Sequence, residues 1–404
     1  MKGDKYIRMR KRKALRLSVL FYLMRILRIK KNKIVFSAFE GDGGYGCNPK
    51  YIAEELHRTH PEYELIWLLH DPNKEFPEYV NPVKDDIWNM VYHLSTAKVW
   101  IDNYRKPYGT RKRKNQLYIQ TWHATIGFKA VGLYRGDSFP EIARLVSEWD
   151  SSLIDYVITN SKYCEDVYPK KLLYTGPTIR TGSPRVDPLI NMRSELQVSI
   201  RKKLGLEDSI KLLLFAPTFR GGNQKGKKQV VSETPVIDFD RLIETLENKF
   251  GGTWNVLLRL HPQLSAKLDE MPLLHKDKKL IDVSKMADMS EIMGGSDLVL
   301  TDYSSCAFDA AFAGIPVQLY ADDVQEYIKS RGQFMWHREE LPFDVAEDEN
   351  TLIENIGRFD INSYLSRVKA FMDKYEVVED GCASKRTVEK IIKMINTTKE
   401  EVNG

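Results

Sequence analysis

Short apolar segments alternate with helical segments along almost the whole chain, and this alternation limits the possible folds more than any other feature. The first series predicts strands at residues 33–39, 64–69, 99–103, 117–120 and 156–160. The second series predicts strands at residues 211–216, 255–260, 280–283, 298–301 and 316–320. The stretches between them have helical character, for example residues 49–57, 238–249 and 306–313. Such alternation is typical of parallel sheets joined by crossover helices, so the sequence predicts an α/β protein.

The two series predict two domains, because 404 residues are too many for one ordinary core. We expect two doubly wound Rossmann-type domains facing a cleft, at residues 34–195 and 196–404. The last helix, residues 383–396, could pack back on the first domain. In open α/β sheets ligands bind beyond the C-terminal ends of the strands. Polar motifs that directly follow predicted strands are therefore the candidate site.

Residues 1–33 form a strongly basic segment ahead of the first domain. They contain thirteen Lys or Arg and one acid, a local charge of +12, so the remaining 371 residues carry −7 of the total of +5. The longest uncharged run, residues 17–24, is far shorter than the roughly 20 residues that span a bilayer. It also lacks the cleavage site of a signal peptide. The segment has no room for a spanning helix.

Large apolar residues lie between the cations of this segment, which predicts a basic amphipathic helix on an anionic membrane surface. A solvated basic arm or a nucleic-acid tail is the alternative, but nucleic-acid arms rarely carry so many large apolar residues. We therefore expect a peripheral protein at the cytoplasmic face of the cell membrane, with the anionic inner membrane surface as a partner and no nucleic acid.

Several familiar chemistries have no sequence signature here. The four cysteines lie far apart and form no CxxC pair, which argues against a disulfide framework or a structural metal. The chain has no GxxxxGKS/T phosphate loop, no HExxH, no GxSxG and no GxGxxG after a strand. P-loop, zincin, serine-hydrolase and dinucleotide-binding activities are therefore not indicated.

The segment LVLTDYSSCAFDAAFAG (298–314) carries the clearest site pattern. A buried strand ends at Thr301, and Ser304 and Ser305 then start a helix whose N-terminal N–H groups and dipole favour phosphate. Asp309 lies on the same helix face as Ser305 and could reach a ribose or polyol hydroxyl. The alternative is that TDYSS only caps the helix, as Ser and Asp often do.

The segment QTWHATIGFK (120–129) places His123 on a loop after a predicted strand, beside Trp122 and Thr125. The ordinary pKa of histidine is near neutrality, so a histidine in this position can act as a general base. The alternative is a histidine that only hydrogen-bonds its own loop.

Three further motifs supply cations at strand ends. LLRLHPQL (257–264) carries Arg259 and His261, FAPTFR (215–220) carries Arg220 after a Pro-Thr turn, and TGSPRVD (181–187) presents Arg185. Singly, each arginine could form a surface ion pair. Their convergence at strand ends favours an anionic diphosphate ligand.

In this order, the motifs resemble the CDP-glycerol glycerophosphotransferase family of teichoic acid primases and polymerases. That family shows WHGTPLKxLG-like, GYPRND, LYAPTxR, RxHP and TDYSSxxFD segments and then an RG pair. The counterparts here are WHATIGFKAVG (122–132), GSPRVD (182–187), LFAPTFR (214–220), RLHP (259–262), TDYSSCAFD (301–309) and RG (331–332). EGDGGYGCNP (40–49) and EDGCASKR (379–386) are also similar to family segments.

Three positions depart from the family pattern. Ala124 replaces a usual glycine, Ile126 a usual proline, and Ser183 a common aromatic residue. These positions lie in acceptor-side or cleft loops, so they bear on the acceptor and on the transferred polyol.

The resemblance implies a GT-B-like fold, a nucleotide held mainly by the C-terminal domain, and neither a cofactor nor a metal. It implies transfer of glycerol phosphate from CDP-glycerol to a lipid-linked teichoic acid or related envelope or capsule polymer, with release of CMP. A CDP-ribitol donor and a nucleotide-sugar glycosyltransferase remain alternatives. A non-catalytic envelope-assembly or nucleic-acid-binding protein is a further alternative, but it leaves the ordered motifs unexplained.

We expect His123 to accept the proton of the attacking hydroxyl, with His261 as a second catalytic group. Without a metal, the charge on the phosphoryl oxygens needs protein donors, here His261, Arg259, Arg185 and the Ser304–Ser305 turn. The other residues expected to bind substrate are Trp122, Ala124, Thr125, Pro217, Thr218, Arg220, Leu260, Thr301, Asp309 and Arg331.

Overall fold

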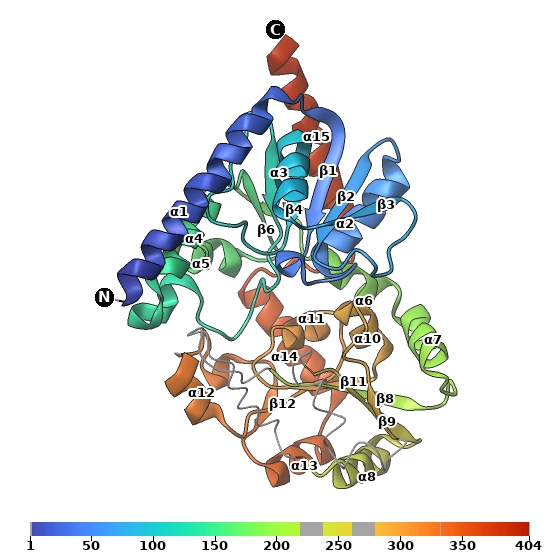
Figure 1. Ribbon diagram of the computed structural model, residues 1–404. Coiled ribbons are helices and arrows are strands. Elements are labelled where there is room, and N and C mark those ends of the chain that lie inside the picture. Colours follow the sequence, from blue (N-terminus) through green and yellow to red (C-terminus); the bar gives the residue numbers. More distant parts are fainter. Residues whose placement is uncertain (1, 219–236, 261–278, 332, 404) are drawn as a thin grey trace. The chain divides into compact units, whose positions relative to one another are not determined.

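The computed structural model describes residues 2–218, 237–260, 279–331 and 333–403, and the chain forms two compact units (Figure 1). Unit 1 comprises residues 1–125, 130–187 and 376–404. Unit 2 comprises residues 126–129 and 188–375. Each unit contains one parallel sheet, which confirms the prediction of two doubly wound α/β sheets.

Unit 1 is built on a seven-stranded parallel sheet with the order β3-β2-β1-β4-β5-β6-β7. The strand order reverses between β1 and β4, which is the position where doubly wound sheets bind ligands. The strands are β1 (Lys30–Ser37), β2 (Glu64–Leu69), β3 (Val80–Lys84), β4 (Ala97–Asp102), β5 (Leu117–Gln120), β6 (Tyr156–Thr159) and β7 (Thr178–Arg180). The helices are α1 (Lys2–Leu23), α2 (Cys47–Thr59), α3 (Ile87–Thr96), α4 (Glu141–Ser151), α5 (Lys162–Lys171) and α15 (Ala383–Asn403), with short 3-10 turns η1 (Met24–Ile26), η2 (Phe39–Gly41), η3 (Gly132–Ser138) and η4 (Pro184–Val186).

The two faces of this sheet are covered by different helices, because successive strand residues point to opposite faces. Ile34 and Phe36 of β1 pack with side chains of α2 and α15. Val35, between them, packs with α1 and α3 on the other face. Figure 1 shows α15, in red, beside the blue N-terminal strands.

Helix α1 is an integral part of unit 1 rather than a separate segment. Leu17 and Phe21 are buried in the core cluster of the sheet, and Ser18 Oγ donates a hydrogen bond to the Gly109 carbonyl at 2.8 Å. A side chain at Gly109 would place its Cβ 2.4 Å from the Ala14 carbonyl oxygen, so this close approach requires glycine. The expected boundary at residue 33 is therefore wrong, and the first strand begins at Lys30. Within the described ranges, no helix is both long enough and apolar enough to cross a membrane.

Unit 2 repeats the same topology in six parallel strands with the order β10-β9-β8-β11-β12-β13. The reversal of strand order lies between β8 and β11. The strands are β8 (Lys211–Ala216), β9 (Trp254–Leu258), β10 (Leu280–Asp282), β11 (Leu298–Thr301), β12 (Val317–Tyr320) and β13 (Asp344–Ala346). The helices are α6 (Asp187–Asn191), α7 (Arg193–Leu204), α8 (Phe239–Phe250), α10 (Met289–Gly295), α11 (Cys306–Phe312), α12 (Val324–Arg331), α13 (Glu349–Gly357) and α14 (Ile361–Lys374), with the 3-10 turn η6 (Arg338–Glu340).

The boundary between the units lies at residues 187/188 rather than at the expected 195/196. Helix α7 packs closely on α10, where a Cβ at Gly295 would lie 2.5 Å from Ile200. Arg201 Nη2 also pairs with Asp297 Oδ2 at 2.6 Å. These contacts attach residues 188–204 to the second sheet. The C-terminal residues 376–404 belong to unit 1 because Ile391 and Ile395 of α15 enter the core of the first sheet.

Candidate active site

His123 lies on the loop that follows β5, at the C-terminal edge of the first sheet. Its Nδ1 is 2.9 Å from the carbonyl oxygen of Asn103, the residue after β4. A carbonyl oxygen only accepts hydrogen bonds, so Nδ1 carries the proton in the neutral ring and Nε2 keeps its lone pair. The rings of Phe39 and Tyr104 contact the imidazole, each at 5.5 Å between centroids. This geometry presents Nε2 as a base.

The surroundings of His123 keep its ring neutral. Burial, together with the nearby cations Arg185, Arg105 and Lys171, lowers the pKa of His123 to about 4. The hydrogen bond to Asn103 acts in the opposite direction. At neutral pH the ring is therefore unprotonated and able to accept a proton.

Trp122, immediately before His123, has a left-handed backbone with φ of +52°. This conformation is uncommon for a bulky residue and costs on the order of 1–3 kcal/mol, so the surroundings must hold it. Gln120 Oε1 accepts a hydrogen bond from Trp122 N at 2.9 Å, and Asn48 Nδ2 donates to Trp122 O at 3.0 Å. Side chains thus hold both backbone polar groups of the residue that orients His123.

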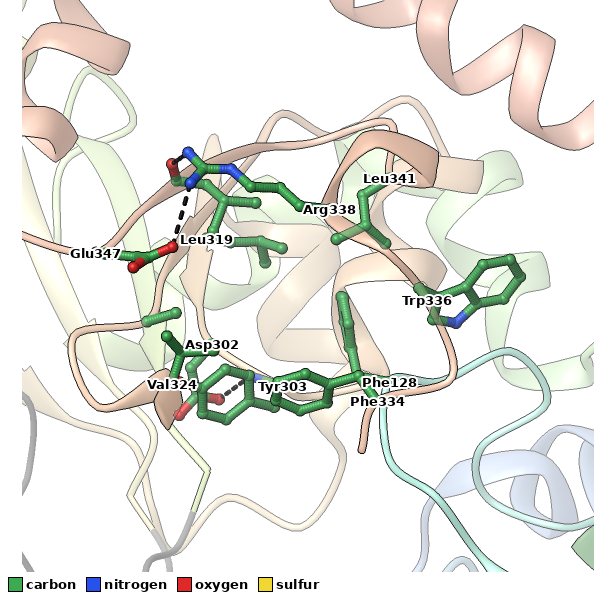
Figure 2. Close-up of a pocket in the computed structure, with 12 residues that line it drawn as sticks. Phe128, Asp302, Tyr303, Leu319, Val324, Phe334, Trp336, Arg338, Leu341 and Glu347 are labelled. Atoms are coloured by element: carbon green, nitrogen blue, oxygen red, sulfur yellow. Dashed lines mark hydrogen bonds and ion pairs between the residues drawn. The ribbon is translucent and has the colours of Figure 1, made fainter. Parts of the chain in front are cut away.

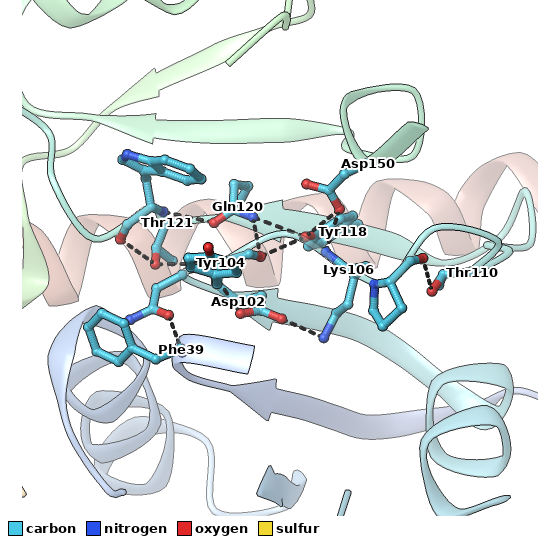
Figure 3. A network of polar contacts seen from close by, with 12 residues as sticks. Phe39, Asp102, Tyr104, Lys106, Thr110, Tyr118, Gln120, Thr121 and Asp150 are labelled. Atoms are coloured by element: carbon cyan, nitrogen blue, oxygen red, sulfur yellow. Dashed lines mark hydrogen bonds and ion pairs between the residues drawn. The ribbon is translucent and has the colours of Figure 1, made fainter. Parts of the chain in front are cut away.

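Gln120 belongs to a buried polar network behind the loop (Figure 3). Its Nε2 donates to Tyr104 O at 2.8 Å and to the Tyr118 hydroxyl at 3.0 Å, and that hydroxyl donates to Asp150 Oδ1 at 3.1 Å. Burial raises the pKa of Asp150 to about 7. A buried network in which every polar group is hydrogen-bonded is rigid, so this network holds the backbone of the His123 loop in one position.

The far end of the loop is held by a buried lysine. Lys171 Nζ donates to the carbonyl oxygens of Ala124 and Thr125 at 3.0 and 2.8 Å. Thr125 Oγ1 lies 3.5 Å from Ser183 Oγ, at the start of the GSPRVD segment. Ser183 N donates to the Glu379 carboxylate, at 3.0 Å for the shorter contact. Two of the family-like segments, GSPRVD and EDGCASKR, therefore meet beside the loop.

Arg185 lies in η4 and is 5% exposed. Its backbone N donates to Asn48 Oδ1 at 3.1 Å, and its Nη1 lies 3.6 Å from Cys47 Sγ. Its charge acts on His123, as the lowered pKa of that ring shows. The structure thus brings Trp122, His123, Ala124, Thr125 and Arg185 together within unit 1.

In unit 2 the predicted residues gather at the reversal of strand order. Asp302, directly after β11, accepts hydrogen bonds from Thr218 N on both carboxylate oxygens, at 2.9 and 2.8 Å. This joins the FAPTFR segment after β8 to the TDYSS segment. Ser305 occupies the N-cap position of α11 without a side-chain cap, which contradicts the capping alternative for this hydroxyl.

Two residues predicted to bind substrate have their polar groups engaged by the protein instead. Thr301 Oγ1 is buried and donates to Ala216 O at 2.6 Å, so it ties β11 to β8. Arg259 Nη1 donates to the carbonyl oxygens of Val283 and Ser284 at 2.9 and 3.0 Å, and also to Met286 O. These contacts give Thr301 Oγ1 and the Arg259 Nη1 group structural roles, and substrate binding by the two residues stays a prediction.

The remaining predicted residues of unit 2 fall into two groups. Pro217, Leu260 and Asp309 are buried at the same sheet edge, and their substrate contacts remain predictions. His261, Arg220 and the side chain of Arg331 lie outside the described residues. Among the residues that are described, no group of three or more His, Cys, Asp or Glu could hold a metal ion.

Unit 2 also contains an aromatic pocket of about 90 Å³ where β11, β12 and β13 end. Phe128, Tyr303, Phe334 and Trp336 wall it, and an ion pair between Arg338 and Glu347 at 3.2 Å lies at its edge (Figure 2). Typical small-molecule pockets measure about 300–1,000 Å³, so we assign no ligand to it.

The comparison with protein families decides to which family the chain belongs. The model of the CDP-Glycerol:Poly(glycerophosphate) glycerophosphotransferase family matches residues 19–393. The chain belongs to this family. The resemblance carried by the ordered motifs is therefore confirmed, and the family match covers both sheets.

Several relatives of this chain are named as enzymes of teichoic acid synthesis. A teichoic acid poly(glycerol phosphate) polymerase of Staphylococcus epidermidis is 31% identical over 369 residues, which cover 88% of this chain and 50% of that protein. A teichoic acid glycerol-phosphate transferase of Staphylococcus aureus is 29% identical, with 90% of this chain and 93% of that protein covered. The chain thus spans half the length of one relative and nearly all of the other.

The solved structures confirm the GT-B-like fold of the family member. The wall teichoic acid polymerase TagF matches with a TM-score of 0.80 and 29% identity, over 100% of this chain and 97% of that one. A TagF variant soaked with CDPG matches with a TM-score of 0.81 and 28% identity, over 98% and 97% of the two chains.

Sequence reasoning missed several residues that build the site. Asn48 and Glu379 lie in segments that resemble the family but carried no assigned role, and Asp302 lies inside TDYSS. Asn103 ends a predicted strand, and a polar residue at a strand end was the available signal. None of these side chains could be paired with its partner before the fold was known.

Proposed function

We propose that this chain transfers a glycerol-phosphate unit from CDP-glycerol to a lipid-linked teichoic acid or related envelope polymer, releasing CMP. The observation that carries the proposal is the tautomer of His123, whose Nε2 is left unprotonated by the contact of Nδ1 with Asn103. The family membership and the names of the relatives support the donor and the acceptor.

In this reaction an acceptor hydroxyl oxygen attacks the phosphorus that bears the glycerol. The new P–O bond joins glycerol phosphate to the acceptor, and the bond to the CMP phosphate oxygen breaks. His123 Nε2 accepts the hydroxyl proton as general base. Arg185, buried beside the same loop, stabilises negative charge on the phosphoryl oxygens.

The donor nucleotide is assigned to unit 2. Thr218 and the Ser304–Ser305 turn flank the reversal of strand order, where doubly wound sheets bind ligands. Pro217 shapes the nucleotide pocket and Asp309 holds hydroxyl groups. His261, Arg220 and Arg331 are assigned to the same function from the family motifs alone.

The outward face of α1 and of the following turn η1 is assigned to the anionic surface of the membrane. Leu15, Leu23 and Ile26 are 66%, 66% and 87% exposed, although Leu17 and Phe21 of the same helical segment are buried. Exposed cations such as Arg12 and Arg16 accompany them. Exposed apolar residues beside cations fit a helix that lies on anionic lipid, which would hold the protein at the cytoplasmic face of the membrane.

The first experiment is CMP release from CDP-glycerol and from CDP-ribitol, with a lipid-linked disaccharide analogue as acceptor. Ribitol is included because relatives named ribitol-phosphate polymerases are 25–27% identical. Acceptor-dependent release from CDP-glycerol that is lost in His123→Ala supports the proposal. Release from CDP-ribitol alone would show that the transferred polyol is ribitol. Turnover of only a nucleotide sugar would show that the chain is a glycosyltransferase instead.

A further inference from the structure

Asn48 uses its whole carboxamide to join two segments of the candidate site. It lies in the first turn of α2, at the end of the glycine-rich EGDGGYGCNP segment, and is fully buried. Its Nδ2 donates to Thr121 O at 3.3 Å and to Trp122 O at 3.0 Å. Its Oδ1 accepts from Arg185 N at 3.1 Å.

The chemistry of these three contacts requires a carboxamide in one orientation. Two carbonyl oxygens need donors and one backbone N–H needs an acceptor, and the NH2 and C=O groups of asparagine supply both at one position. Aspartate could still accept from Arg185 N but would place an oxygen against two carbonyl oxygens. Alanine would leave all three buried backbone groups without this partner, which is costly.

The two joined segments carry the proposed catalytic groups. Trp122 is the strained residue before His123, and any movement of its carbonyl moves the histidine ring. Arg185 is one of the three cations that lower the pKa of that ring. All of these contacts lie within unit 1, so the Asn48 side chain directly joins the segment before His123 to the segment of Arg185.

We propose that Asn48 is a positioning residue that fixes His123 relative to Arg185. The proposal rests on the proposed function for its catalytic consequence, because Asn48 itself contacts no reacting atom. Its structural consequence, the placement of the His123 ring, can be measured without any turnover.

The test compares Asn48→Ala and Asn48→Asp with Asn89→Ala. Asn89 is the control outside the site, because its Nδ2 also donates to a backbone carbonyl, Lys84 O at 3.1 Å, from a partly exposed position on α3. The first readout is the rate at which diethyl pyrocarbonate modifies His123, located by peptide mass spectrometry. The second readout is kcat for acceptor-dependent CMP release, with the melting temperature measured for every variant.

We expect diethyl pyrocarbonate to modify His123 about tenfold faster in Asn48→Ala than in the unchanged protein. A tenfold change corresponds to the free energy of about one buried hydrogen bond. We expect kcat to fall roughly 100-fold, the effect of a misplacement of about 1 Å. Asn48→Asp should show the same two effects as Asn48→Ala, because it also loses the hydrogen bonds to the carbonyl oxygens of Thr121 and Trp122. Asn89→Ala should change neither value.

An unchanged modification rate of His123 in both Asn48 variants would overturn the positioning role, whatever happens to turnover. If Asn48→Ala does not fold, Asn48→Asp decides by the same two readouts. Full activity of His123→Ala would instead show that His123 is not the general base, and the modification rate would still report whether Asn48 positions the ring.

In a His123→Ala background, Asn48→Ala should lower kcat little further, since the effects of residues that act as a unit are not additive. A full additional loss there would show that Asn48 acts elsewhere.

Discussion

His123 Nδ1 lies 2.9 Å from the carbonyl oxygen of Asn103, and this single contact determines which ring nitrogen is available. The two residues come from loops after neighbouring parallel strands, β5 and β4, whose C-terminal ends meet at one edge of the sheet. A side-chain partner such as a carboxylate would stabilise the charged ring. A carbonyl oxygen fixes the tautomer with less stabilisation of the charge, so the ring can remain a neutral base.

The pH dependence of turnover should reflect this environment. His123 must be unprotonated to accept a proton, so activity falls as the pH drops through its pKa, which is lowered to about 4 in the free protein. The acid limb of kcat/KM should therefore lie near pH 4. A bound anionic diphosphate favours the charged ring, so the limb of kcat should lie at higher pH. Coincident limbs near pH 6.5 would contradict the buried, neutral histidine.

Replacing His123 should remove most of the rate without unfolding the protein. General base catalysis contributes typically 10²–10⁴-fold, so we expect His123→Ala to lower kcat by about that factor. Donor binding should change little, because the donor nucleotide is assigned to unit 2. Isothermal titration with CDP-glycerol and CMP-release assays measure the two quantities. Equal losses of donor affinity and kcat would indicate a binding role instead.

Asp302→Asn should weaken both the fold and the donor site. The substitution places an NH2 group against Thr218 N, where two carboxylate oxygens now accept, and should cost about 1–3 kcal/mol in the free energy of unfolding. Because Thr218 belongs to the proposed nucleotide pocket, KM for CDP-glycerol should rise as well. Urea unfolding and CMP release measure the two effects.

Asp348→Ala is the control for Asp302→Asn. Asp348 caps α13 by accepting from Thr351 N at 2.9 Å, so removal of its carboxylate should lower the free energy of unfolding by about 0.5–2 kcal/mol and leave KM unchanged. A rise of KM in both variants would mean that destabilisation alone accounts for the weaker donor site.

The packing of α1 predicts opposite results for two neighbouring residues. Phe21 is 2% exposed in the core cluster of the first sheet, so Phe21→Ala should lower the free energy of unfolding by about 3–5 kcal/mol. Leu23 is 66% exposed, so Leu23→Ala should stay within about 0.5 kcal/mol of the unchanged protein. Thermal or urea unfolding distinguishes them, and similar values would contradict the observed docking of the helix.

Binding to anionic vesicles should depend on the outward face of α1 and η1. We expect replacement of Leu15, Leu23 and Ile26 by serine to weaken binding about tenfold or more, since a fully buried leucine contributes about 1.5–3 kcal/mol. Binding to phosphatidylglycerol vesicles, measured by sedimentation, should also weaken with salt. Val198→Ser, at a residue 53% exposed on α7, is the control. Equal binding by the triple variant would exclude α1 as the anchor.

The sequence was sufficient for the central strands but predicted only one of the edge strands of the two described sheets, β10 (Leu280–Asp282). Strands 64–69, 117–120, 211–216 and 298–301 match the structure at both ends. The strands β3, β7 and β13 were missed, and all three lie at sheet edges. An edge strand pairs on one side only and is partly exposed, so it lacks the continuous apolar run that marks a buried parallel strand.

The sequence also indicated which loops form the candidate site, because polar motifs after the parallel strands of one sheet must meet at one edge of that sheet. Only the tertiary structure decided what each side chain does there. It directed Arg259 Nη1 to loop carbonyls and buried the inner face of α1. It also paired Asn48 with Thr121 and Arg185, which lie 73 and 137 positions away in the sequence. Hydrogen bonds between distant residues depend on distance and angle within a few tenths of an ångström, and a linear pattern of residue types contains no such information.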